Sequence, residues 1–99
     1  MRIIARKTLV EAWTRHPSTE QPLRAWYQDA RISTWGGPQA IRAMYPTASI
    51  VGDDRVVFNI KGNGFRLVVA VNYAAQIIFI KFFGTHAEYD KINVKDVHR

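Results

Sequence analysis

Cysteine is absent from this 99-residue chain, and histidine occurs only at His16, His86 and His98. A chain without cysteine has no disulfide framework, no thiolate nucleophile and no cysteine-ligated zinc or iron–sulfur site. Since histidine is also scarce, we expect chemistry that uses neither a metal ion nor a cofactor.

Long apolar runs are missing as well. No run approaches the roughly 18 residues that indicate a membrane-spanning helix, and the opening segment, Met1 to Lys7, lacks the apolar stretch and cleavage site of a signal peptide. We therefore expect a cytoplasmic protein with no membrane partner.

Acidic residues are few: eight Asp and Glu stand against fourteen Lys and Arg, which gives a net charge of +6. The stretch from 55 to 83 carries four cations and no acid, or +4 of that total, at Arg55, Lys61, Arg66 and Lys81. Such an excess indicates an anionic partner: a nucleic acid, an acidic protein or a membrane surface. A membrane surface fits least, because no predicted helix combines a basic face with a strongly apolar one.

The length allows one domain, residues 1–99, with 93–99 as a flexible tail. A short strand is expected at 2–5, then helices at 7–15 and from Ser18, the predicted N-cap, to Ser33. A short helix follows at 38–44, strands at 56–60, 65–73 and 76–83, the last broken by Gly84, and a closing helix at 85–91. This order predicts an α+β fold, with two N-terminal helices packed on an antiparallel sheet.

Alternation along the strands separates the cations from the apolar core. Arg55, Asn59 and Lys61 share one face of the strand at 56–60, and Lys81 lies between Phe79 and Phe83. We expect one apolar face under the helices and a second, basic face that grips a phosphodiester backbone. The alternative for each cation is a solvated strand residue that keeps the sheet soluble.

The segment Thr85 to Asp90 is the most informative. Thr85 and Glu88 form a capping-box pattern, which places His86 and Tyr89 on one face of a short helix. Backbone N–H groups at a helix start favour a phosphate and disfavour an imidazolium, so His86 is a candidate neutral base.

Tyr89 is a candidate to donate or position a proton. Cleavage of RNA by its own 2′-OH needs a base, an acid and cations on the phosphate. The residue types that can supply these are His86, Tyr89, Lys61, Lys81 and Arg66. The alternative is an ordinary helix cap with a half-exposed His86. A metal site is disfavoured, because Glu88 points away from His86 and Asp90 in a helix.

Two segments together resemble the HigB toxins of the RelE-like superfamily: 59–69 (Asn-Ile-Lys-Gly-Asn-Gly-Phe-Arg-Leu-Val-Val) and 85–91 (Thr-His-Ala-Glu-Tyr-Asp-Lys). The opening Met-Arg-Ile-Ile and the segment Ala43 to Pro46 are similar too. The resemblance implies two N-terminal helices on a curved antiparallel sheet. It also implies an endonuclease that cuts translated mRNA in the ribosomal 30S A site without metal, leaving a 2′,3′-cyclic phosphate. Its partner would be a cognate helix-turn-helix, HigA-like antitoxin.

The resemblance also suggests roles. Arg66 matches the superfamily's strand arginine, which stabilises the phosphate, and Lys61 matches a sheet lysine. His86 and Tyr89 fall in the segment that supplies acid and base, with their order left open. The predicted RNA contacts are Lys81, Arg55, Asn59 and Asn63. The alternative function is a basic module that binds RNA or an acidic partner without cutting.

Overall fold

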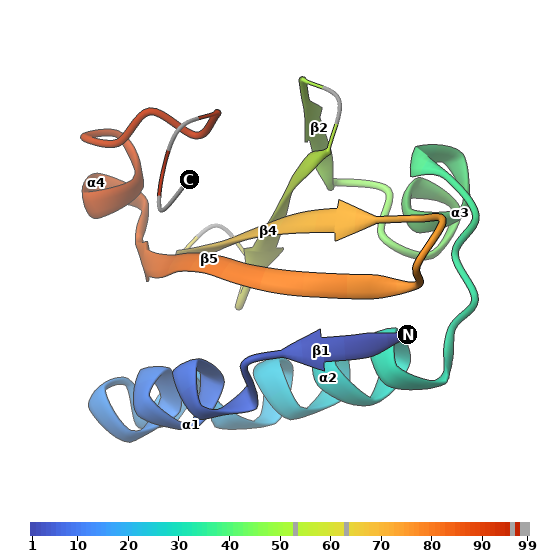
Figure 1. Ribbon diagram of the computed structural model, residues 1–99. Helices are drawn as coiled ribbons and strands as arrows, with labels where there is room; N and C mark the ends of the chain where they lie inside the picture. The colour runs from blue at the N-terminus through green and yellow to red at the C-terminus, as the bar shows by residue number, and fades with distance from the viewer. Residues whose placement is uncertain (53, 63, 96, 98–99) are drawn as a thin grey trace.

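The computed structural model describes residues 1–52, 54–62, 64–95 and 97. A twisted five-stranded sheet has helices α1 and α2 under one face and α4 on the other side (Figure 1). In chain order the elements are β1 (Arg2–Ile4), α1 (Arg6–Arg15), a 3₁₀ turn (Pro17–Thr19), α2 (Glu20–Ile32), α3 (Pro38–Met44), β2 (Ser49–Val51), β3 (Arg55–Ile60), β4 (Phe65–Asn72), β5 (Ile77–Thr85) and α4 (His86–Tyr89). This confirms the predicted α+β class. Across the described residues, no helix is both long and apolar enough to cross a lipid bilayer.

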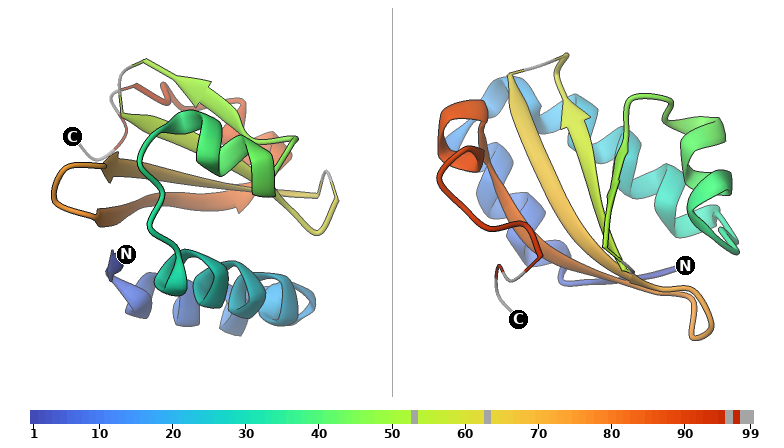
Figure 2. Two further views of the ribbon diagram at one scale, coloured as in Figure 1. Left: turned by 90° about the vertical axis from the view of Figure 1, so that its right-hand side faces the viewer. Right: turned by 90° about the horizontal axis from the view of Figure 1, so that it is seen from above.

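The strand order in the sheet is β1-β5-β4-β3-β2, and Figure 2 shows its twist from two sides. Strands β2 to β5 pair antiparallel, as expected, but β1 pairs parallel with β5. Strand β2 was not predicted. The β4–β5 ladder pairs Val68 with Phe82 and then Val69 with Ile80, so Lys81 is an extra residue at a β-bulge. A bulge increases the local twist and changes the direction of side chains beyond it.

The core lies between the helices and the sheet. Helix α1 buries Leu9, Ala12 and Trp13, the residues predicted from its periodicity. Three residues at the same helical spacing in α2 are also buried: Leu23, Trp26 and Ala30. They meet the inward-facing side chains of β3 and β4, which alternate with outward-facing ones.

Phe58 of β3 is the centre of this core and is 1% exposed. Its ring centroid lies 5.4 Å from that of Trp26 in α2, 5.2 Å from that of Tyr45 after α3, and 6.5 Å from that of Trp35. The Tyr45 hydroxyl donates to the Asp29 carboxylate at 2.5 Å. Burial, with this hydrogen bond, raises the pKa of Tyr45 above its ordinary value. One aromatic cluster therefore joins α2, α3 and the sheet.

The predicted start of α2 at Ser18 is wrong. Pro17 begins a 3₁₀ turn of its own, and α2 starts only at Glu20. Thr19 is fully buried, and its hydroxyl donates to the His16 carbonyl at 2.7 Å instead of capping the helix. The capping pattern at Ser18 does not predict the helix start, because a proline can begin a 3₁₀ turn as well as end a helix.

The second face of the sheet is not the open basic surface that alternation predicts. Val57, Val68 and Ala70 are buried on it, and Arg55 is only 4% exposed. The Arg55 guanidinium donates to the carbonyl of Val97 at 2.9 Å, because the segment after α4 returns to this face. Alternation assigns a residue to a face, but it does not show what later covers that face. The predicted flexibility of 93–99 stays a prediction.

Truncating the central ring tests this core. We expect Phe58→Ala to lower the free energy of unfolding by about 3–5 kcal/mol, because the cavity loses contacts with three other rings. Ile32→Ala is the control: Ile32 is 66% exposed, so the change should stay within about 0.5 kcal/mol. Urea denaturation measures both, and equal small losses would contradict the central place of Phe58.

Candidate active site around helix α4

Helix α4 is held at its start by a reciprocal pair of hydrogen bonds. The backbone N–H of Thr85 donates to Glu88 Oε1 at 2.8 Å, and that of Glu88 donates to Thr85 Oγ1 at 3.2 Å. This confirms the predicted capping box. The backbone and side-chain hydrogen bonds with Thr85 hold the pKa of Glu88 below its ordinary value, and the charges of His16 and Arg15 lower it further.

Three backbone donors at the start of α4 already have partners. In addition to the two capping-box bonds, the His86 N–H donates to the Gly64 carbonyl at 3.2 Å, which ties α4 to the β3–β4 turn. Helix α4 has four residues, so few peptide dipoles add up along it. The expectation that N–H groups at this helix start bind a phosphate stays a prediction, and the side chains around α4 are the other candidates to hold an anion.

Gly84 does not end β5, which continues to Thr85. A Cβ at position 84 would lie 2.7 Å from Phe82 Cζ and 3.0 Å from Glu88 Oε1. A side chain at this position would crowd Phe82 and Glu88, because α4 folds back closely onto its own strand. The sequence suggests that Gly84 breaks the strand, whereas in the structure Gly84 lies where α4 comes close to β5.

His86 is paired with an acid on its own helix. Its Nδ1 lies 3.0 Å from Oδ2 of Asp90, and both side chains are more than half exposed. When Nδ1 carries the proton and donates to this carboxylate, Nε2 is left as the acceptor facing solvent. From the sequence alone, Asp90 is a candidate only for a disfavoured metal site, and its pairing with His86 is not predicted. The spacing of four residues was the available signal, because such residues are neighbours on a helix.

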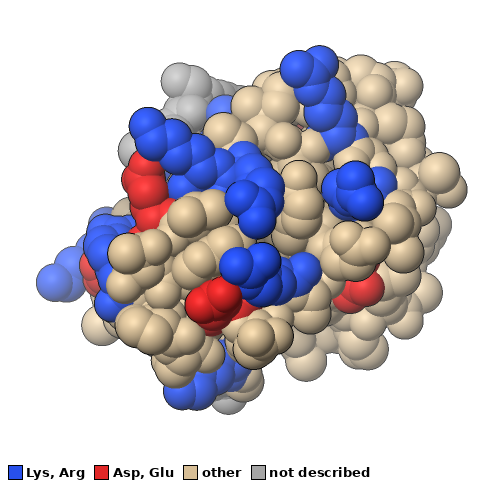
Figure 3. All heavy atoms as spheres, turned by 90° about the horizontal axis from the view of Figure 1, so that it is seen from below, with Lys and Arg blue, Asp and Glu red and all other residues tan. Residues whose placement is uncertain are grey.

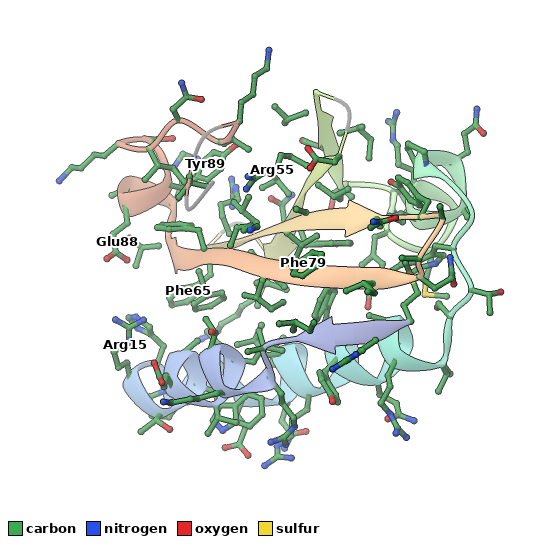
Figure 4. All side chains as sticks on the ribbon, viewed as in Figure 1. Arg15, Arg55, Phe65, Phe79, Glu88 and Tyr89 are labelled. Carbon is green, nitrogen blue, oxygen red and sulfur yellow. The ribbon has the colours of Figure 1, made fainter. Side chains whose placement is uncertain are left out.

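Arg66 lies under the other end of α4. Its Cζ is 5.9 Å from the centroid of the Tyr89 ring, and Nη1 donates to the Phe65 carbonyl at 3.2 Å. In the sheet Arg66 stands between Asn59 of β3 and Gly84 of β5. Figure 4 shows Tyr89 on the side of the sheet away from α1 and Arg15. The structure therefore brings Arg66, Asn59 and Tyr89 to one place.

The two predicted lysines, Lys61 and Lys81, lie at different positions relative to Arg66 and Tyr89. Lys61 is exposed and begins the β3–β4 turn, with a left-handed φ of 54°. Lys81 is half-buried, with Nζ 5.5 Å from the Phe79 ring. The bulge directs Phe79 and Phe83 to opposite faces, so Lys81, which lies between them in the sequence, does not share a face with both.

Two other predicted contacts do not join the site. Arg55 is buried at the far end of β3 and bonds to the tail, which favours a structural role. Asn63 lies outside the described residues. Within the described part of the chain, no group of three or more His, Asp or Glu side chains could hold a metal ion.

Comparisons with known proteins agree on one family. A family model for HigB toxins, described as the RelE-like toxic component of a toxin–antitoxin system, matches residues 19–92. An mRNA interferase toxin HigB of Escherichia coli strain K12 is 30% identical over 101 residues, covering 100% of this chain and 95% of the relative. An mRNA interferase HigB of Shigella flexneri matches to the same extent. Another, of Escherichia coli O6:H1, is 24% identical over 94 residues, covering 93% of this chain and 91% of the relative.

The fold is that of a RelE-like toxin, a small α+β protein with helices packed on a mostly antiparallel sheet. The chain belongs to the HigB family of these toxins. The family implies a cognate antitoxin as a partner.

The close approach at Gly84 is testable. We expect Gly84→Ala to displace α4 and to cost about 1–3 kcal/mol of stability, because the new methyl group overlaps Phe82 and Glu88. Gly36→Ala is the matched control, since a Cβ there meets nothing within 4 Å. Thermal unfolding and amide shifts of residues 85–90 report the effect. Unchanged shifts in Gly84→Ala would show that α4 does not depend on this glycine.

The capping box predicts a pH dependence. Because folding lowers the pKa of Glu88 below 4.5, its stabilising effect is present above that pH and is lost as pH falls through the lowered value. Glu88→Gln should therefore be less stable than the natural protein at pH 7, and the difference should shrink below pH 4.5. Urea denaturation across pH measures it. A pH-independent difference would contradict a role for the charge.

Proposed function

We propose that this toxin is an endoribonuclease that cleaves translated mRNA on the ribosome, in the cytoplasm, and is neutralised by a helix-turn-helix antitoxin. Its relatives are named mRNA interferases. The observation that carries the proposal is the arrangement around α4. The guanidinium carbon of Arg66 lies 5.9 Å from the centroid of the Tyr89 ring. On the same helix, Nδ1 of His86 lies 3.0 Å from the Asp90 carboxylate.

These groups match the needs of RNA cleavage by the adjacent 2′-OH. The 2′-oxygen forms a bond to phosphorus while the bond from phosphorus to O5′ breaks, leaving a 2′,3′-cyclic phosphate and a 5′-OH. A base takes the 2′-OH proton and an acid supplies a proton to O5′. Cations stabilise the extra negative charge on the phosphate in the transition state.

His86 is the proposed base. Asp90 accepts from Nδ1 and so directs Nε2, the unprotonated nitrogen, outward to the 2′-OH. Arg66 is the proposed phosphate ligand. Tyr89 is the proposed acid: its ring lies over the Arg66 guanidinium, so a phosphate held by Arg66 would be close to this phenol, which would protonate O5′.

The remaining site residues would hold the RNA on either side. Lys61 at the β3–β4 turn and Lys81 at the bulge add positive charge, and Asn59 offers an amide next to Arg66. We leave Arg55 out of the RNA contacts, because it is buried and bonded to Val97.

A purely RNA-binding module is the competing function. It explains the cations as well, but it gives no reason for an exposed imidazole oriented by an acid. The two functions differ in one observable, since only the enzyme creates new RNA ends.

The test uses purified toxin, translating ribosomes and a defined message, with reverse-transcription stops as the readout. We expect His86→Ala to slow cleavage on the order of 10²–10⁴-fold, and Arg66→Ala about 10²–10³-fold. Asp90→Asn should reduce cleavage less and shift its pH profile, because the imidazole loses its carboxylate partner. Lys91→Ala, which removes an exposed cation just after α4, is the control and should cleave normally.

Two results would contradict the proposal. If the natural protein binds ribosomes and leaves no new ends, the toxin is a binding module. If His86→Ala cleaves at the natural rate, His86 is not the base, whatever the other variants do.

A further inference from the structure

A groove on the outer surface of the helical layer is not used by the proposed chemistry. It has a volume of about 330 Å³ and is lined by residues of α1 and α2: Arg6, Trp13, Arg24, Tyr27, Gln28 and Arg31. Figure 3 shows this side of the molecule, on which blue side chains gather with fewer red ones between them. The sheet lies between this groove and α4, so the two are on opposite sides of the molecule (Figure 1).

Cations and rings alternate in the groove. The Arg6 guanidinium carbon lies 5.5 Å from the centroid of the Trp13 ring and 5.4 Å from that of Tyr27. The Arg24 guanidinium carbon lies 4.6 Å from the same Trp13 centroid. Stacking on a ring fixes the plane of a guanidinium while its N–H groups stay available for an oxyanion.

The arginines of the groove differ in whether an acidic side chain pairs with them. Arg24 already pairs with Glu20 at 2.8 Å. In the part of the chain that the structure describes, neither Arg6 nor Arg31 forms an ion pair. The groove therefore offers two guanidinium groups for carboxylates or phosphates, set beside an aromatic floor.

The surroundings favour a protein over an RNA backbone. Residues 1–32 carry six cations but also three acids, Glu11, Glu20 and Asp29, for a net +3. A continuous polyanion running along these helices would pass the carboxylates of Glu11 and Glu20, whereas a peptide with separate acids can avoid them. Trp, Tyr and Arg are also the residue types that dominate binding energy at protein interfaces.

We propose that this groove binds an acidic segment of the cognate antitoxin that the family implies. Carboxylates of the segment pair with Arg6 and Arg31, and its apolar parts pack on Trp13 and Tyr27. Binding at this place leaves the α4 site open, so the groove anchors the antitoxin without competing with RNA for Arg66. The inference rests on the family and on the groove, and it does not require the proposed cleavage mechanism.

The test compares Arg6→Gln/Arg31→Gln with a control of equal charge change, Lys7→Gln/Arg42→Gln, whose positions are exposed outside the groove. The antitoxin used is the product of the open reading frame adjacent to the toxin gene, and calorimetry measures its affinity. We expect the groove variant to bind it at least roughly tenfold more weakly, and the control to bind as the natural protein does. Coexpressed antitoxin should then fail to neutralise the groove variant, which remains toxic.

A labelled uridine decamer is the second probe, because it separates a protein site from an RNA site. All three proteins should bind it alike. Equal antitoxin affinity in the groove variant and the control would overturn the proposal. Loss of the uridine decamer from the groove variant, with antitoxin affinity unchanged, would overturn it in favour of an RNA site. Calorimetry measures antitoxin binding whether or not the protein cleaves RNA. The binding test can therefore be interpreted even if the proposed cleavage activity is not found.

Discussion

The packing of Phe58 against Trp26, Tyr45 and Trp35 is the interaction on which the rest of the structure depends. It fixes the sheet against α2 and the end of α3, and it commits one face of β3 to the core. The other face of the same strands is then left for α4, the tail and the candidate site. Burial of an aromatic cluster on one side therefore determines where the chemistry lies on the other.

The site itself depends on a second constraint, the short distance between β5 and α4. A reversal directly after Thr85 returns the chain over its own sheet, and the glycine at position 84 leaves room for Phe82 and Glu88 at this close approach. The capping box and the bond from His86 N–H to Gly64 fix the direction of the helix. As a consequence, Tyr89 lies over Arg66, and Asp90 stands one turn after His86. Four-residue α4 is too short to be stable alone, so its contacts with the sheet carry its stability.

The sequence alone predicts those features that depend on contacts between residues close together in the chain. The buried residues of α1, the capping box at Thr85 and the core-facing residues Val56, Phe58 and Ile60 of β3 all follow from the spacing of neighbours. The sequence does not predict features that depend on contacts between distant segments. The parallel pairing of β1 with β5 joins segments separated by most of the chain, and the burial of Arg55 depends on where Val97 returns. The bulge at Lys81 has no residue signature of its own, and it changed which side chains share a face.

The central claim is that the toxin uses the RNA's own 2′-OH as the nucleophile. The most direct measurement replaces that one hydroxyl with hydrogen at the mapped cleavage site of a translated message and compares the ends formed. The account predicts that cleavage stops at the 2′-deoxy position while ribosome binding persists, and that the all-ribose message ends in a 2′,3′-cyclic phosphate. Continued cleavage of the 2′-deoxy message at the same bond would contradict it.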